Sequence, residues 1–141
     1  MTRTLLTLGA LTAAVAAGTV AARRNLILTT VDGDSMEPSL HSGDRVLIRR
    51  TRRARRGQIT LLLSDHDVLL LKRTVAVTGD QVPKEWSEID MKSLAGTTVP
   101  PDTVIVLGDN RPSSYDSRHF GHVRRSRVVG VLLTRVHRRS A

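Results

Sequence analysis

The stretch ITLLLSDHDVLLLKRTVAV, residues 59–77, decides the fold of this chain. Residues 59–63 and 68–77 are both rich in leucine, valine and isoleucine, and the polar residues 64–67 separate them. Two β-rich runs joined by so short a polar segment predict a β-hairpin. Three more short apolar runs lie elsewhere in the chain, at residues 46–48, 104–107 and 128–136. The pattern predicts a mainly β protein built from short strands.

One segment interrupts the series of strands. Residues 81–103 are mixed and polar and contain three prolines, so we expect a long loop or a small excursion there. No run beyond the N-terminus has a convincing helical period. A length of 141 residues is enough for one small domain and an appendage.

The composition restricts the chemistry. Aromatic residues make up only 2% of the chain, so the core must consist of leucine, valine and isoleucine. The absence of cysteine excludes a disulfide framework and a thiolate metal site. The net charge of +9 comes mostly from arginine and favours contact with phosphate, either of nucleic acid or of anionic lipid.

Residues 4–22, TLLTLGALTAAVAAGTVAA, contain no charged side chain. As a helix this segment would be roughly 28 Å long, close to the hydrocarbon thickness of a bilayer. A single uncleaved membrane anchor is the favoured interpretation, and a cleaved secretion signal or a buried soluble helix are the alternatives. Arg3 precedes the segment and Arg23 follows it, so flanking charge does not fix an orientation.

The run RRTRRARR, residues 49–56, is strongly basic. It is either a solvated loop between two strands, a contact with anionic lipid or a contact with nucleic acid. A nucleic-acid reader would usually show a helix-turn-helix, a zinc motif or an aromatic platform beside such a run. None of these patterns is present, so we expect no nucleic-acid partner.

A serine in the turn GDSMEPSL, residues 33–40, is a candidate nucleophile. Ser35 is followed directly by the apolar Met36, so the turn either buries one methionine or presents the serine to something apolar. A nucleophilic serine needs a base, because its hydroxyl is weak at its free pKa. The chain has five histidines, and none of them sits in a recognisable triad motif; residues 64–67, which contain triad residue types, are a turn.

Lys72 is the better candidate base. Period-two alternation places it on one face of its strand with Leu70, Thr74 and Ala76, which are small or apolar. Burial there would lower the pKa of the lysine, because an apolar site disfavours the charged form. A neutral lysine can accept a serine proton, whereas arginine stays protonated in proteins. The alternative is a lysine whose ammonium reaches solvent from the strand edge.

A third segment, GDNRPSSYDSRHFG at residues 108–121, concentrates aspartate and arginine in a loop. It is either a charge-paired loop that stiffens a site or a solvated surface loop. Together and in this order, the three segments resemble the serine box, the lysine box and the last box of the type I signal peptidases of the S26 family. These enzymes are membrane-bound serine proteases with a Ser–Lys dyad. The pair Gly33–Asp34 is closest to the Gram-positive and actinobacterial members.

The resemblance implies a role for each matched residue. Ser35 would be the nucleophile, Lys72 the general base, and Ser114 would hydrogen-bond and orient the lysine amine. Asp116 and Arg118 would form the supporting ion pair. Val31, Met36 and Leu70 would line pockets that accept small residues of the substrate. The backbone N–H of Ser35 would contribute to the oxyanion hole; Gly33 lacks the hydroxyl that some members use as a second donor. No metal or cofactor is implied.

The resemblance also implies an organisation and a function. Residues 1–24 would be the anchor in the plasma membrane, and residues 25–141 an extracytoplasmic catalytic domain with little or no second β domain. The substrates would be preproteins that carry signal peptides, with membrane lipid as the other partner. The departures are Ala76 and Thr78 in the lysine box and Gln58 before the strand at 59–63.

Two alternatives stay open. One is a specialised maturation protease of the same superfamily that acts on a single dedicated precursor. The other is a catalytically silent, membrane-anchored basic protein that binds lipid or nucleic acid. Self-cleaving repressors share Ser–Lys chemistry, but the hydrophobic N-terminus and the complete last box speak against them.

Overall fold

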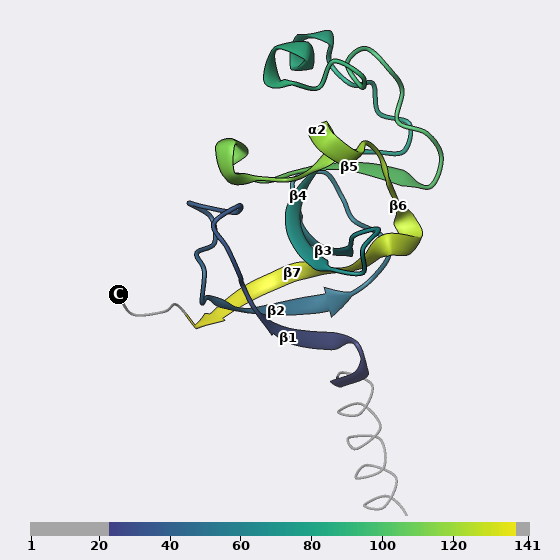
Figure 1. Ribbon diagram of the computed structural model, residues 1–141. Helices are drawn as coiled ribbons and strands as arrows, with labels where there is room; N and C mark the ends of the chain where they lie inside the picture. The colour runs from purple at the N-terminus through teal and green to yellow at the C-terminus, as the bar shows by residue number, and fades with distance from the viewer. Residues whose placement is uncertain (1–22, 138–141) are drawn as a thin grey trace, which may run out of the picture.

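The computed structural model describes residues 23–137. Seven strands form one antiparallel sheet in the order β1-β2-β7-β3-β4-β5-β6, and the sheet curls strongly on itself (Figure 1). The strands are β1 Leu26–Thr30, β2 Arg45–Arg50, β3 Ile59–Leu63, β4 Leu69–Val77, β5 Thr103–Leu107, β6 Val123–Arg124 and β7 Val128–His137. The prediction of a mainly β protein is confirmed.

The central hairpin forms as the sequence predicts. β3 and β4 pair in antiparallel register, with Leu61 opposite Leu71, and Ser64 and Asp67 close the turn through a backbone hydrogen bond of 3.0 Å. The final strand β7 lies between β2 and β3, so residues distant in sequence close the sheet. Two strands, β1 and β6, were not predicted. The predicted anchor at residues 4–22 falls outside the described residues.

Helical structure is sparse in the described part of the chain. The helices are the 3-10 helices η1 Lys84–Ile89, η2 Arg111–Ser113 and η3 Arg125–Arg127, and the short α-helix α2 Ser117–Phe120. Between residues 23 and 137, none of the helices has the length and apolar character needed to cross a membrane.

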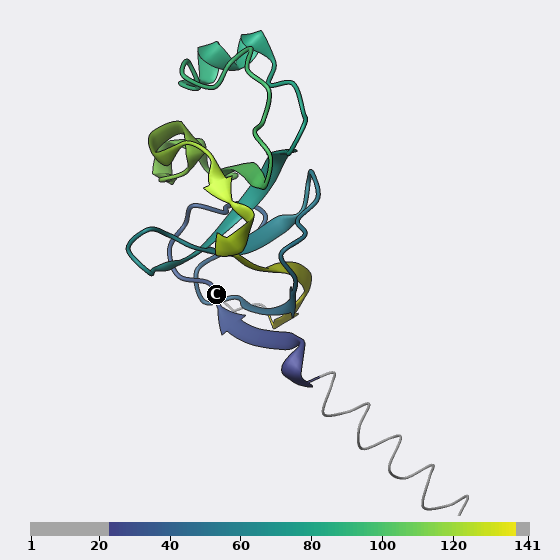
Figure 2. The same cartoon turned by 90° about the vertical axis from the view of Figure 1, so that its right-hand side faces the viewer.

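The excursion at residues 81–103 is a small lobe that projects from one end of the sheet in both views (Figures 1 and 2). Instead of a plain loop, it contains η1, an isolated bridge between Gln81 and Thr98, and buried apolar residues of its own. Met91 is fully buried and belongs to the same apolar cluster as Ile105 and Leu107 of β5. The lobe therefore packs against the strand that leads into the loop 108–121.

Replacing Met91 with alanine is expected to destabilise the protein by about 3 kcal/mol, because the change leaves a cavity in this cluster. Denaturant unfolding of the full-length protein in uncharged detergent would measure the change. The exposed Lys92→Ala is the neighbouring control and should leave stability nearly unchanged. A loss below about 1 kcal/mol for Met91→Ala would mean that the lobe does not depend on this packing.

Candidate active site

The serine turn connects β1 to β2 and is held by its own backbone. The N–H of Glu37 donates to the carbonyl of Asp34 at 3.0 Å, and the N–H of Leu40 donates to that of Met36 at 2.9 Å. Met36 is only 1% exposed and packs in the apolar cluster with Val31 and Leu40. The turn therefore buries its methionine and at the same time presents the adjacent Ser35.

Ser35 and Lys72 lie in direct contact. The Nζ of Lys72 is 2.7 Å from the Oγ of Ser35, although 37 positions separate the two residues in sequence. Lys72 is 3% exposed, and the same face of β4 carries the buried Thr74 and Ala76. The alternation predicted for this strand therefore places the amine inside the protein and beside the serine hydroxyl.

The surroundings of Lys72 favour its neutral form. Burial is the main cause and lowers the pKa of Lys72 below its ordinary value of 10.5. The negative charge of Asp116 acts in the opposite direction, and the positive charge of Arg118 acts with burial. The net direction is downward, which makes a proton-accepting amine more available.

Asp116 is the centre of a hydrogen-bond network behind this pair. Its carboxylate accepts from the Ser114 hydroxyl at 2.7 Å, the Gly108 N–H at 2.9 Å and the Arg118 Nε at 2.9 Å. Burial alone would raise the pKa of Asp116, but hydrogen bonds from Arg118, Gly108 and Ser114 hold it below its ordinary value. The side chain is fully buried and ion-paired with Arg118.

The hydroxyl of Ser114 has a different hydrogen-bond partner from the Lys72 amine that the family resemblance implies. It donates to Asp116, and within residues 23–137 no hydrogen bond joins it to Lys72. The cause is the nearby carboxylate, which is a stronger acceptor than a serine or an amine. Ser114 is nevertheless close to the serine turn, because a Cβ built on Gly108 would lie 2.1 Å from the Ser114 Oγ and 2.7 Å from the Ser35 carbonyl oxygen. Only glycine fits between them.

An ion-pair clamp that the sequence does not predict joins the serine turn, β4 and the loop 108–121. Arg73 donates to both carboxylate oxygens of Asp109, at 2.8 and 2.6 Å, and also to the Ser39 hydroxyl at 3.2 Å. Ser39 in turn donates to Asp109. The sequence predicts charge pairs within the loop 108–121, but the partner of Asp109 in this loop is Arg73 on β4. The available signal was Arg73 itself, a charged residue beside the candidate base.

Two further contacts fix the serine turn against the loop 108–121. The N–H of Asn110 donates to the Ser35 carbonyl at 3.0 Å, and its side-chain amide donates to the Asp34 carbonyl at 3.2 Å. Among the described residues, the N–H of Ser35 itself has no hydrogen-bond partner. Gly33 brings no side chain to the turn, and its φ of 80° is a conformation that suits glycine.

A small cavity opens beside the Ser35–Lys72 pair. Its volume is about 100 Å³, and its walls come from the end of β1, the serine turn, β3 and β4. The predicted pocket residues Val31, Met36 and Leu70 all line it, as do Ser35 and Lys72. Polar and apolar residues share its walls, and the cavity has room for a small side chain.

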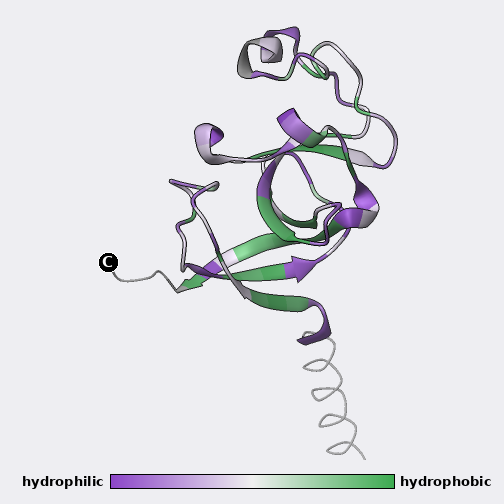
Figure 3. Ribbon diagram, viewed as in Figure 1, coloured by the Kyte–Doolittle hydropathy of each residue, from purple (hydrophilic) through white to green (hydrophobic). Residues whose placement is uncertain are grey.

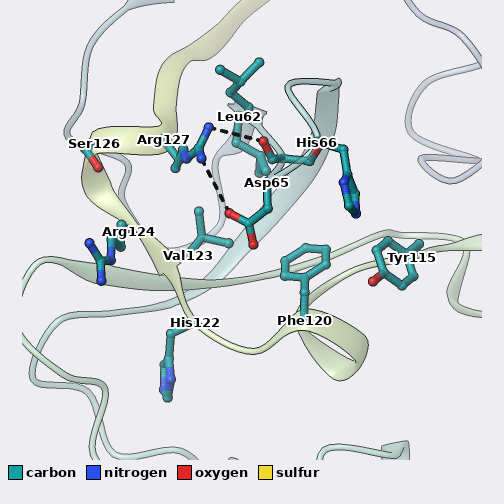
Figure 4. Close-up of a pocket in the computed structure, with 12 residues that line it drawn as sticks. Leu62, Asp65, His66, Tyr115, Phe120, His122, Val123, Arg124, Ser126 and Arg127 are labelled. Atoms are coloured by element: carbon teal, nitrogen blue, oxygen red, sulfur yellow. Dashed lines mark hydrogen bonds and ion pairs between the residues drawn. The ribbon is translucent and has the colours of Figure 1, made fainter.

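A larger cavity of about 430 Å³ lies between the β3–β4 turn and the segment 115–127 (Figure 4). Tyr115 and Phe120 form part of its wall, and Arg127 is 3.7 Å from Asp65 across it. Neither Ser35 nor Lys72 lines this cavity. The chemistry of the Ser–Lys pair therefore belongs to the smaller one.

The curled β-sheet places a serine hydroxyl against a buried lysine amine, which is an arrangement that serine proteases use. Comparison with known proteins points to the same class. Residues 83–137 match the family of signal peptidases, peptidase S26, and residues 9–83 match the peptidase S24-like family. Signal peptidase I V of Bacillus subtilis is 29% identical over 135 residues, which cover 72% of this chain and 80% of that protein.

Two other relatives are more than 30% identical. Subunit 1a of the mitochondrial ATP-independent inner membrane protease of Arabidopsis thaliana is 34% identical over 121 residues, or 80% of this chain and 72% of that protein. Signal peptidase I S of Bacillus subtilis is 31% identical over 141 residues, or 77% and 76%. A solved signal peptidase I from Enterococcus faecalis V583 matches with a TM-score of 0.47 at 24% identity, over 57% of this chain and 97% of that one. The chain belongs to the signal peptidase S26 family and is a serine endopeptidase.

Proposed function

We propose that this protein cleaves signal peptides from exported preproteins, with Ser35 as the nucleophile and Lys72 as the general base. The observation that carries the proposal is the 2.7 Å contact between the Ser35 Oγ and the amine of a lysine that is 3% exposed. Membership of the signal peptidase family supports the substrate class.

The geometry supports the following sequence of steps. Neutral Lys72 accepts the hydroxyl proton as the Ser35 Oγ bonds to the scissile carbonyl carbon. The backbone N–H of Ser35 donates a hydrogen bond to the developing oxyanion. The lysine ammonium then donates its proton to the leaving amine of the mature protein. Water attacks the acyl-enzyme with Lys72 again as base, and the signal peptide leaves with a free carboxylate.

Asp116 and Arg118 have a positioning role in this proposal. Their buried ion pair fixes the backbone of the loop 108–121 behind Gly108, and this loop holds the serine turn through Asn110. Ser114 acts through Asp116 rather than through the lysine amine. Val31, Met36 and Leu70 limit the size of the side chain that precedes the scissile bond.

The proposal also places the protein in the plasma membrane. Residues 4–22 are the proposed single span, the division into an anchor and a catalytic domain falls at residues 24–25, and the catalytic domain faces the extracytoplasmic side. The uncharged segment and the membrane setting of the family's signal peptidases support this placement. A single dedicated precursor, in place of a general substrate set, is the alternative within the same chemistry.

A preprotein with an Ala-X-Ala site tests the function. The full-length protein in uncharged detergent is expected to cut after the second alanine, as intact mass spectrometry of both products would show. Enlarging that alanine to leucine should lower kcat/KM by about 10- to 100-fold, since the buried Val31 and Met36 line the cavity and would have to move to admit a larger side chain. A leucine at the second residue after the cleaved bond is the matched control. Equal cleavage of both alanine and leucine substrates would contradict the assignment of this cavity.

A further inference from the structure

Six exposed arginines gather at one end of the β1–β2 pair. Because the two strands are antiparallel, the start of β1 lies beside the end of β2: Leu26 is opposite Arg49, and the Arg50 N–H donates to the Asn25 carbonyl at 2.7 Å. Figure 3 shows both places as hydrophilic. We call this group the basic end, and its members are Arg23, Arg24, Arg49, Arg50, Arg52 and Arg53.

In the described part of the chain no carboxylate forms an ion pair with the basic end; Asp102 lines one cavity together with Arg52 but is paired with Arg125. Between residues 23 and 137, none of its six arginines forms an ion pair, whereas Arg56 reaches Asp80 at 2.8 Å and Arg135 reaches Asp44 at 2.8 Å. Like charges at such short spacing repel one another. The surface therefore suits an anionic partner outside the chain.

The position of the basic end indicates which anion it meets. The uncharged segment 4–22 stops one residue before Arg23, and strand pairing carries Arg49 and Arg50 to the same place. With this segment in the bilayer, as the proposed function requires, the basic end lies at the headgroup layer. A planar guanidinium binds phosphate oxygens through two parallel hydrogen bonds.

We propose that the basic end binds the phosphate groups of anionic phospholipids and so docks the β1–β2 edge of the sheet on the membrane surface. Nucleic acid fits this surface less well, because unpaired bases stack on aromatic side chains. Trp86 belongs to the lobe, and Tyr115 and Phe120 line the cavity of Figure 4, so none of these rings is at the basic end.

The test uses the full-length protein in an uncharged detergent, with native mass spectrometry to measure the binding of single lipids. Phosphatidylglycerol and phosphatidylcholine with the same acyl chains are the two probes. The wild type is expected to prefer phosphatidylglycerol, and the preference should weaken between low and high salt. The double variant Arg49→Gln/Arg52→Gln should bind phosphatidylglycerol about 25-fold more weakly, at about fivefold for each arginine near a membrane surface.

The control pair Arg45→Gln/Lys92→Gln removes the same charge from exposed positions away from the basic end and should keep the preference. Equal binding of the two lipids by the wild type, or an equal loss in both double variants, would overturn the proposal. Displacement of the lipid by millimolar glycerol phosphate would reassign the surface to a soluble phosphate compound. Tighter binding of a 20-nucleotide RNA, lost in the same variant, would reassign it to nucleic acid.

Failure of this inference is distinguishable from failure of the proposed function. Cleavage of the model preprotein in uncharged detergent is expected to be unchanged in Arg49→Gln/Arg52→Gln, since neither residue lines the small cavity. A wild type that prefers phosphatidylglycerol but cleaves nothing would defeat the peptidase proposal alone. A wild type that cleaves but shows no lipid preference would defeat only the docking surface.

Discussion

Replacing Lys72 with methionine is expected to lower kcat/KM for preprotein cleavage about a thousandfold or more. Methionine fills nearly the same space but cannot accept a proton, so the Ser35 hydroxyl loses the only base within 2.7 Å in the described structure. General-base catalysis alone contributes about 10² to 10⁴ in rate, and without it the acyl-enzyme cannot form efficiently. Cleavage of the Ala-X-Ala preprotein in detergent measures the loss.

Three further variants sharpen this test. Lys72→Arg should be as inactive as Lys72→Met, because a guanidinium stays protonated. Ser35→Ala should lose a similar amount, and the double variant Ser35→Ala/Lys72→Met should be no worse than either single one, since the two groups act in one step. Lys92→Met, on the exposed surface of the lobe, is the matched control. Substantial activity in Ser35→Ala would refute the mechanism, and an inactive wild type would favour a dedicated precursor or a silent binding protein.

Ser35 and Lys72 also determine whether the cleavage rate rises or falls with pH. Burial lowers the pKa of Lys72 from 10.5, and only the neutral amine can accept the Ser35 proton. The rate should therefore rise with pH through the lowered pKa and reach its plateau below the pH at which an ordinary lysine deprotonates. A rise centred at or above 10.5 would contradict the burial argument.

The parts of the fold that could be predicted are those with a local signal. The β3–β4 hairpin and the face of Lys72 follow from the alternation in residues 59–77, because the period of a strand is a property of consecutive residues. β1 was missed because its five residues, LILTT, show no alternation of polar and apolar side chains and stand only three residues after the uncharged segment 4–22. β6 has only two residues and no pattern of its own.

The candidate site divides in the same way. The sequence motifs bring Ser35 and Lys72 to attention, but the Arg73–Asp109 ion pair joins positions 36 apart, and its geometry depends on how β4 meets the loop 108–121. The orientation of the Ser114 hydroxyl likewise depends on competition between acceptors, which no spacing in the sequence records. Sequence motifs can therefore identify the residues of the site, whereas the contacts among these residues follow only from the folded sheet.

Asp116→Asn is expected to destabilise the protein by about 3–5 kcal/mol, because it removes the charge that Arg118 needs while that guanidinium stays largely buried. The asparagine NH₂ would also face the Gly108 N–H or the Arg118 side chain, placing donor against donor. Denaturant unfolding at neutral pH measures the loss. Asp65→Asn is the control, since its ion pair with Arg127 is exposed and worth less than about 1 kcal/mol.

The pH dependence of the stability difference between wild type and Asp116→Asn distinguishes the effect of the Asp116 charge from that of hydrogen-bond geometry. The folded-state pKa of Asp116 lies below its ordinary value of 3.8, so the carboxylate stabilises the protein fully above that value. The stabilisation is lost as the pH falls through the lower folded-state pKa, and the gap between wild type and Asp116→Asn should close there. A gap that stays constant down to the acid transition would mean that hydrogen-bond shape, and not the charge on Asp116, holds the loop behind Ser35.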